Sequence, residues 1–238
     1  MEKIKEPLPN AQTQRAYRVK ITLFLFYVGL TVIGLSVSYQ GFAALTRLKS
    51  VESERDRWQR ANEVIQALGL REGAVVADFG SGVGYFTLKL ANRVGPKGKV
   101  LPVDIRRVSL LFLQARAWWR QLYNIEIIHS DPDNPHLPAG HLDAVLVANT
   151  YHELVHPNLI LAALYRSLVS GGRLVVIDRG AGTVGEETRE GQAKHHELSL
   201  SIGEKEIAQA GFEITRLQDN FTVEPGRGPW WLIVARKP

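Results

Sequence analysis

The sequence predicts an α/β fold with a doubly wound, mostly parallel sheet of seven strands and an antiparallel hairpin at the sheet edge. Three observations support this fold. Strand-like and helix-like segments alternate from residue 74 onward, and a glycine-rich turn links the first strand to a helix. An uncharged apolar run precedes them and adds one N-terminal transmembrane helix. We expect a basic tail at 1–20, a transmembrane anchor at 21–46, a connecting helix at 47–70 and the α/β domain at 71–238.

The strands and helices of the domain follow in a regular order. The first strand, Ala74–Phe79, is apolar and β-branched, as buried parallel strands are. The further strands are expected at Lys99–Asp104, Glu126–His129, Leu142–Ala148, Arg173–Asp178, Phe212–Gln218 and Trp230–Ala235. Helices are expected at Arg107–Leu122, Pro157–Leu168 and Gly203–Ala210. A turn-rich segment at 225–229 joins the last two strands, which predicts antiparallel pairing between them.

Composition limits the chemistry that the chain can perform. The 238 residues include no cysteine, which excludes disulfides, thiolate metal sites and cysteine nucleophiles. The net charge is +5, of which residues 1–20 carry +3 and the rest only +2. Because the globular part has no dense basic stripe, we expect no nucleic-acid partner.

The run Ile21–Thr46 contains no charged residue and is rich in Leu, Ile, Val and Phe. At about 1.5 Å per residue, a helix of this length crosses a hydrocarbon core of about 30 Å. A cleaved signal peptide ending near Gly41-Phe42-Ala43 is an alternative, and a buried core helix is another. Both flanks of the run carry five basic residues, so charge does not determine the orientation of the anchor.

The glycine turn follows Asp78, with glycines at 80, 82 and 84. Glycines allow the backbone to approach a ligand closely, and the following helix N-terminus presents unpaired N–H groups. A dinucleotide fingerprint would need its third glycine at position 85, which is Tyr85. This departure argues against a nicotinamide cofactor.

The Asp-x-Gly-x-Gly-x-Gly pattern resembles motif I of the class I S-adenosylmethionine-dependent methyltransferases. The predicted order of elements is similar to the Rossmann-like topology of that family over about residues 55–238. The resemblance implies S-adenosylmethionine as cofactor, with the turn beneath its methionine part and Asp78 anchoring its amino group. The cofactor-binding residues expected from it are Asp78, Gly80, Ser81, Gly82, Gly84, Tyr85, Asp104, Ile105, Asp131 and Asn149.

Three of these residues are expected at the adenosine end. Asp104 ends the second strand, where an acidic side chain can accept both ribose hydroxyls, and the family resemblance implies the same role. The resemblance places Ile105 on the adenine face and Asp131 at the adenine amino group. The alternatives are a helix cap for Asp104 and a plain turn for Asp131, which lies in Asp-Pro-Asp-Asn-Pro.

The segment after the fourth strand faces the departing methyl group, because that strand is expected beside the first. Tyr151 is predicted to line the methyl path, and His152 or Glu153 to accept a substrate proton. The segment lacks the prolines of the Asn-Pro-Pro-Tyr-like motif in amino-methylating relatives. The alternative is that His152 caps the next helix and Glu153 is merely exposed.

Two further segments are candidates for contact with substrate or membrane. His195 and His196 lie in an insertion where family members often place substrate contacts, and the glycines of 180–191 are typical of a mobile gate. No H-E-x-x-H pattern is present, so no metal is expected. The helix at 46–70 is either a solvated face or a lid over the cofactor. Trp118-Trp119 and Trp230-Trp231 are expected in the core, with one of each pair at a membrane interface as the alternative.

Together these features predict a membrane-anchored methyltransferase that moves a methyl group by SN2 transfer to an unidentified acceptor. The anchor favours a small-molecule, lipid-like or otherwise apolar acceptor, and cytosolic supply of S-adenosylmethionine favours a cytoplasmic catalytic domain on a single-pass anchor. The alternative is a membrane-tethered protein that binds the cofactor or a partner without catalysis. The sequence leaves the oligomeric state open.

Overall fold

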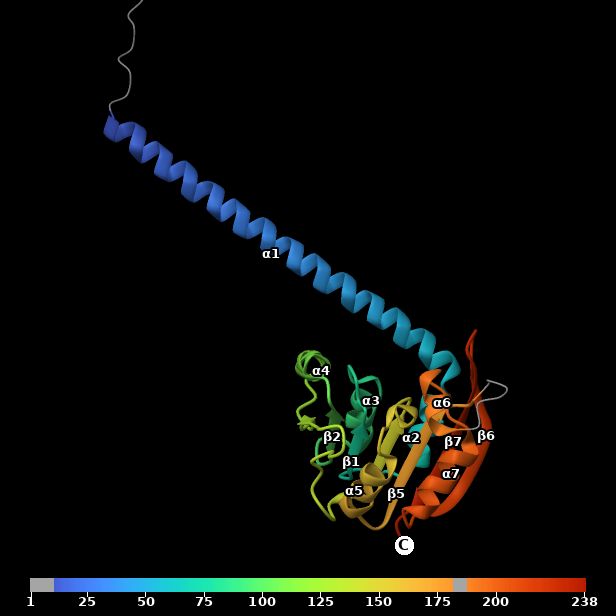
Figure 1. The fold of residues 1–238 in the computed structure, drawn as a ribbon. Helices are drawn as coiled ribbons and strands as arrows, with labels where there is room; N and C mark the ends of the chain where they lie inside the picture. Colours follow the sequence, from blue (N-terminus) through green and yellow to red (C-terminus); the bar gives the residue numbers. More distant parts are fainter. Residues whose placement is uncertain (1–10, 182–187) are drawn as a thin grey trace, which may run out of the picture. The chain divides into compact units, whose positions relative to one another are not determined.

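The computed structural model describes residues 11–181 and 188–238 (Figure 1). The chain divides into two compact units, Met1–Glu54 and Arg55–Pro238. Helix α1 runs from Ala11 to Trp58. Its residues up to Glu54 are the described part of the first unit, and its residues from Arg55 onward belong to the second unit. The second unit contains the whole sheet and all other helices that the structure describes.

Helix α1 contains a stretch long and apolar enough to cross a membrane, judged by length and composition only. The helix also covers residues 11–20 of the expected basic tail, and residues 1–10 lie outside the described part. The predicted connecting helix at 47–70 is divided, because Arg60 adopts a left-handed backbone with φ of 52° between α1 and α2 (Ala61–Ala67).

The seven-stranded sheet has the order β3-β2-β1-β4-β5-β7-β6, which confirms the predicted fold class (Figure 1). The five strands β1 to β5 pair in parallel, and β7 pairs antiparallel with both β5 and β6. The strands are β1 (Val75–Phe79), β2 (Lys99–Asp104), β3 (Ile128–His129), β4 (Leu142–Ala148), β5 (Leu168–Arg179), β6 (Glu213–Glu224) and β7 (Gly228–Arg236). The prediction that the first and fourth strands are adjacent in the sheet is therefore confirmed.

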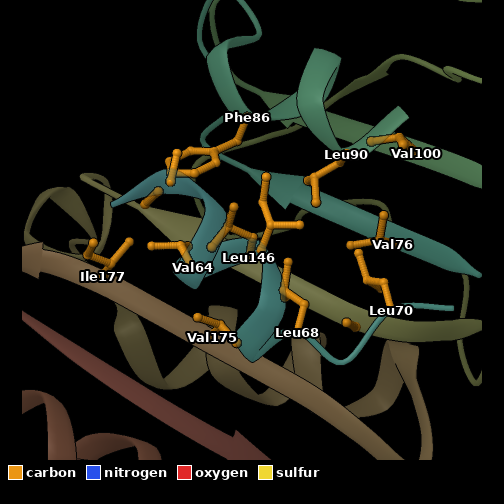
Figure 2. Packing of buried hydrophobic residues seen from close by; sticks show 14 of the residues in the cluster. Val64, Leu68, Leu70, Val76, Phe86, Leu90, Val100, Leu146, Val175 and Ile177 are labelled. Carbon is orange, nitrogen blue, oxygen red and sulfur yellow. The ribbon is translucent and has the colours of Figure 1, made fainter. Parts of the chain in front are cut away.

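Hydrophobic side chains cover both faces of the sheet, because successive strand residues point to opposite sides. On one face, Val76, Leu146 and Val175 pack with residues of α2 and of α3 (Tyr85–Val94), as Figure 2 shows. On the other face, Ala77, Val145 and related residues pack with α5 (Pro157–Ser167) and α7 (Leu200–Gln209). The sheet therefore forms the middle layer, and its carboxyl edge holds the loops after β1, β2, β4 and β5.

The remaining helices lie beside these loops. They are α4 (Arg107–Trp119), the short 3-10 helix η1 (Tyr151–Glu153) and α6 (Arg189–Lys194). Trp230 and Trp231 are buried in the two cores, whereas Trp118 and Trp119 on α4 are 69% and 81% exposed. The prediction that both tryptophan pairs lie in the core is therefore confirmed for Trp230 and Trp231 and wrong for Trp118 and Trp119.

Candidate active site

The glycine turn after β1 needs glycine for two different reasons. Gly80, Gly82 and Gly84 all have positive φ, at 75°, 53° and 89°, a region that other residues enter only at a steric cost. At Gly80 a Cβ atom would lie 2.1 Å from Thr150 Oγ1, and at Gly84 it would lie 2.7 Å from Leu113 Cγ. At Gly82 the nearest atom would be 3.9 Å away. Two of these glycines therefore allow close packing, and the third faces open space.

A cavity of about 330 Å³ opens at this turn, at the carboxyl edge of the sheet. This is where parallel α/β sheets bind their ligands. Five parts of the fold contribute to it: the turn after β1, the start of α3, the loop after β4, the start of α4 and the end of α1. The lining includes Arg55, Asp78, Gly80, Ser81, Gly82, Tyr85, Arg106, Asn149, Thr150 and Glu153. Six of the ten expected cofactor residues are among them.

Asp78 is the buried carboxylate of this cavity. Its side chain accepts a 2.5 Å hydrogen bond from Thr87 Oγ1 on α3. Burial raises the pKa of Asp78 to about 6, while the hydrogen bond from Thr87 and the charge of Arg55 oppose the rise. A cationic ligand group in the cavity would favour the ionised carboxylate further.

Two buried polar atoms in the cavity wall have no hydrogen-bond partner among the described residues. They are Ser81 Oγ and Asn149 Oδ1. Asn149 also holds a left-handed backbone with φ of 56°, which is uncommon outside glycine. Buried polar atoms are nearly always paired in native proteins, so these two atoms are suited to pairing with a polar ligand.

Asp104 ends β2 as expected but is not among the residues that line the cavity. Its carboxylate is almost fully buried and accepts hydrogen bonds of 2.8 Å from the backbone N–H groups of Gly82 and Arg106. The residue that lines the cavity here is Arg106, whose side chain lies 3.3 Å from Asp104. Asp104 therefore fixes the glycine turn to the end of β2, and contact with ribose stays a prediction.

Ile105 and Asp131 lie outside the lining of the cavity. Ile105 is 56% exposed, and Asp131 is an exposed residue whose carboxylate lies 2.8 Å from His136 Nε2. Asp131 also forms a bridge with Asn134, which matches the turn alternative for this segment. Contact of either residue with adenine stays a prediction.

The end of α1 reaches the cavity, in line with the lid alternative for this helix. The Arg55 guanidinium lies 4.1 Å from the centroid of the Tyr85 ring and also lines the cavity. Tyr85 donates a hydrogen bond of 2.7 Å to Asp56, and Lys89 forms an ion pair of 2.8 Å with the same carboxylate. The sequence left a solvated face and a lid as alternatives for this segment, because charge alone does not indicate which side chains turn inward.

A buried histidine–carboxylate pair joins the loop after β4 to the carboxyl end of β5. His152 Nδ1 is 2.8 Å from Asp178 Oδ1, and the backbone N–H of His152 donates to the other carboxylate oxygen. Burial lowers the pKa of His152, but the hydrogen bond and charge of Asp178 raise it by more, so that the pKa lies above its ordinary value. Asp178 fixes the ring so that Nε2 points away from it.

Two exposed residues extend this pair. Glu153 Oε1 lies 3.9 Å from His152 Nε2, and the His196 ring stands edge-on to the His152 ring at 5.6 Å between centroids. Because Glu153 also lines the cavity, a polar path leads from the cavity to Asp178. The three residues His152, Glu153 and His196 place ligand atoms within 4.8 Å of one another, a grouping that can hold a metal ion, although no metal was expected.

Tyr151 departs from its expected place on the methyl path. Its side chain is fully buried, and its hydroxyl donates a 2.8 Å hydrogen bond to Glu206 on α7. Burial and Glu206 raise the pKa of Tyr151, which keeps the phenol protonated. The residue stabilises the loop after β4 and does not line the cavity. The expectation that ligands bind beyond the carboxyl ends of parallel strands identified the loop after β4 correctly. It did not indicate which side chains of that loop turn into the core.

Arg189 and Asp178 were not among the expected site residues. Arg189 on α6 donates hydrogen bonds to the carbonyl oxygens of Tyr151 and Leu154 and pairs with Glu206. It thereby attaches the insertion after β5 to the loop that carries His152. Asp178 could have been found as an acidic residue at a strand's carboxyl end; Arg189 had no such signal.

The two expected substrate histidines have different environments. His196 faces His152, whereas His195 is an exposed residue that ends α6. The centre of the predicted gate, residues 182–187, lies outside the described residues.

Comparisons with known proteins agree with this geometry. A family described as "Methyltransferase domain" matches residues 76–172. The chain is 31% identical over 122 residues to the ubiquinone/menaquinone biosynthesis C-methyltransferase UbiE of Pseudomonas entomophila, a match that covers 51% of this chain and 47% of the relative. The chain thus spans about half the length of the curated relatives it matches.

Solved structures share the fold at low sequence identity. A SAM-dependent methyltransferase from Aquifex aeolicus is similar with a TM-score of 0.66 and 23% identity, covering 80% of this chain and 96% of that one. The [4+2]-cyclase SpnF is similar with a TM-score of 0.67 and 17% identity, covering 76% and 81% of the two chains. At these identities the likeness concerns the fold, and a shared fold hosts more than one chemistry.

Proposed function

We propose that this chain, a class I S-adenosylmethionine-dependent methyltransferase by fold and by sequence family, transfers a methyl group to a small, apolar acceptor. The observation that carries the proposal is the cavity at the glycine turn, which joins a buried carboxylate, Asp78, to the unpartnered polar atoms of Ser81 and Asn149. A ligand with an ammonium group and further polar groups fits that arrangement. The cofactor supplies a methyl group already activated on a sulfonium.

The chain's own residues would bind and orient the cofactor. Asp78 faces its cationic amino end, and the Arg55 guanidinium in the same cavity suits its carboxylate. Gly82 leaves space for the methionine part because no neighbour fills the position of a Cβ there. Since the methyl is already activated, most of the rate enhancement would come from alignment and exclusion of water.

The polar path from the cavity would carry away the acceptor's proton. Glu153 receives it at the cavity wall, and His152, held by Asp178, takes it at Nε2. The 3.9 Å gap between Glu153 and His152 is one that a small side-chain rotation or a bridging water closes. Methyl transfer to a hydroxyl or to an activated ring carbon releases one proton, which this path can accept.

The acceptor class follows from two independent features. The relatives named for ubiquinone and menaquinone biosynthesis act as C-methyltransferases, which favours a quinone-like ring. The apolar stretch of α1 favours an acceptor that partitions into a bilayer. We propose a single-pass anchor through residues 21–46, with the domain on the cytoplasmic side, where S-adenosylmethionine is available.

Calorimetry on the full chain in detergent tests the cofactor. S-adenosylmethionine and S-adenosylhomocysteine should bind and NAD should not, and Asp104→Ala should weaken binding about tenfold or more through loss of the charged hydrogen bonds that fix the turn. NAD binding would refute the family assignment for this site.

Incubation with methyl-labelled cofactor and a membrane lipid extract tests the transfer. Label should enter an apolar product, and mass spectrometry should show one added methyl group. Tight cofactor binding without any labelled product, across lipid, quinone and protein fractions, would favour the alternative of a tethered binding protein. Transfer that stops with a chelator and returns with a divalent ion would assign His152, Glu153 and His196 to a metal instead of a proton path.

A further inference from the structure

Helix α4 is apolar on two sides, but only one side is packed. Leu110, Leu113 and Ala117 are buried against the domain. On the outward side, four large apolar side chains recur at helical spacing and are exposed, followed by an exposed tyrosine just after the helix. The exposed fractions are 79% for Val108, 71% for Leu111, 69% for Trp118, 81% for Trp119 and 79% for Tyr123. Exposed apolar patches of this kind mark interaction surfaces.

The charge of this segment has one sign only. Residues 105–123 contain four arginines and no acidic residue. Arg116 is buried and donates to the carbonyl of Val83, whereas Arg107 and Arg120 are exposed at the two ends of the helix. Tryptophan and tyrosine beside arginine are the residues that favour the boundary between lipid headgroups and acyl chains. Arginine there is attracted to anionic headgroups.

We propose that this α4 face, formed by Val108, Leu111, Trp118, Trp119 and Tyr123 with Arg107 and Arg120, docks on the surface of a bilayer that contains anionic phospholipid. A bilayer suits the face better than a protein partner for two reasons. The charge is complementary to anionic headgroups, and α1 of the same chain contains a stretch able to span a membrane. This contact is separate from the anchor and made by the globular domain.

Docking of the α4 face would also affect how the methyl acceptor enters the cavity. Arg106 and Ser109, which line the cavity, lie within one helical turn of Val108. The rim of the cavity would therefore adjoin the lipid surface, so that an apolar acceptor could reach it without crossing water. This consequence rests on the proposed function; the docking itself does not.

The absence of cysteine allows a direct test on the full chain. Leu111→Cys receives a nitroxide spin label, and Lys205→Cys on α7, also exposed, serves as the matched control. Both proteins are reconstituted into vesicles of phosphatidylcholine with phosphatidylglycerol. At position 111 the ratio of oxygen to aqueous nickel accessibility should rise several-fold over detergent, while the label at 205 stays water-accessible. Circular dichroism confirms that each variant is folded.

The charge reversal Arg107→Glu with Arg120→Glu, combined with Leu111→Cys, should return the label at 111 to water, as should vesicles of phosphatidylcholine alone. A label at 111 that stays as water-accessible as the one at 205 in vesicles that retain the chain would overturn the proposal. So would shielding that persists without lipid and shows dipolar broadening, because that result would assign the face to a second copy of the chain.

Discussion

The ionised form of Asp78 destabilises the folded chain, but it is the form that we propose binds the cationic end of the cofactor. Its pKa is raised by burial, so the folded chain favours the protonated form more strongly than the unfolded chain does. For a carboxyl group shifted in this direction, the ionised form destabilises the fold, and stability is lost as pH rises from 3.8 to about 6. A buried carboxylate with this property is typical of a binding site.

We expect Asp78→Asn to raise the free energy of unfolding above pH 6 while it weakens, without abolishing, the binding of S-adenosylmethionine. The gain is at most about 3 kcal/mol, since the pKa rises from 3.8 to about 6 and each unit is worth about 1.4 kcal/mol. Denaturant unfolding and calorimetry measure the two effects. In the unmodified chain, affinity should increase between pH 5 and pH 7 as Asp78 ionises, and this trend should disappear in the variant. Equal affinities at pH 5 and pH 7 would contradict the role of Asp78.

His152 shows the same direction of pH dependence as Asp78, because its folded pKa is also raised, although its protonated form is the charged one. The stabilisation from its pairing with Asp178 is complete below the ordinary histidine pKa of about 6.5 and is lost as pH rises through the higher folded value. A proton acceptor must be neutral, so methyl transfer should increase with pH through that same value.

We expect Asp178→Asn to lower the midpoint of His152 titration, because the variant removes the charge that raises the pKa. Titration of the ring signal by NMR measures this midpoint without any acceptor. Asp133→Asn is a matched control, since Asp133 forms a similar 2.9 Å contact with the exposed His156. An unchanged midpoint in Asp178→Asn would show that Asp178 does not control the protonation of His152.

At the scale of elements, the glycine turn joins β1, α3 and α4. The three turn glycines share a left-handed backbone but face different surroundings, so equal substitutions should have different effects. Gly84 packs against Leu113 of α4, and Gly82 faces the cavity. One residue therefore supports helix packing and the other supports ligand access.

Gly84→Ala should lower stability more than Gly82→Ala does. Both substitutions strain the backbone by about 1–2 kcal/mol, and at Gly84 overlap with Leu113 adds about 1–3 kcal/mol. Gly82→Ala should instead weaken S-adenosylmethionine binding in a chain that stays folded. Thermal unfolding and calorimetry on both variants separate the effects. Equal losses of stability would mean that Gly84 does not determine how α4 packs.

At the scale of the whole molecule, local patterns predicted the fold and long-range contacts determined the site. The strands Lys99–Asp104 and Leu142–Ala148 have the predicted bounds, because their buried β-branched runs end at clear turn signals. The break at Arg60 was not predicted, since a left-handed arginine leaves no mark in the sequence. The pairing of His152 with Asp178 joins the loop after β4 to the neighbouring strand β5, and only the order of strands in the sheet reveals it.

Removal of residues 1–45 separates the two membrane contacts that we propose. The shortened chain keeps Arg55 and the compact unit Arg55–Pro238, so it should bind S-adenosylmethionine as the full chain does. The full chain should remain in membranes through alkaline carbonate and high salt. The shortened chain should bind anionic vesicles through α4 alone, and salt should release it, because exposed charges are screened within about 10 Å at 0.1 M. Sedimentation with vesicles at low and high salt measures both behaviours. Full-chain release by carbonate would refute the anchor, and salt-resistant binding of the shortened chain would show that apolar insertion of α4 outweighs its charge.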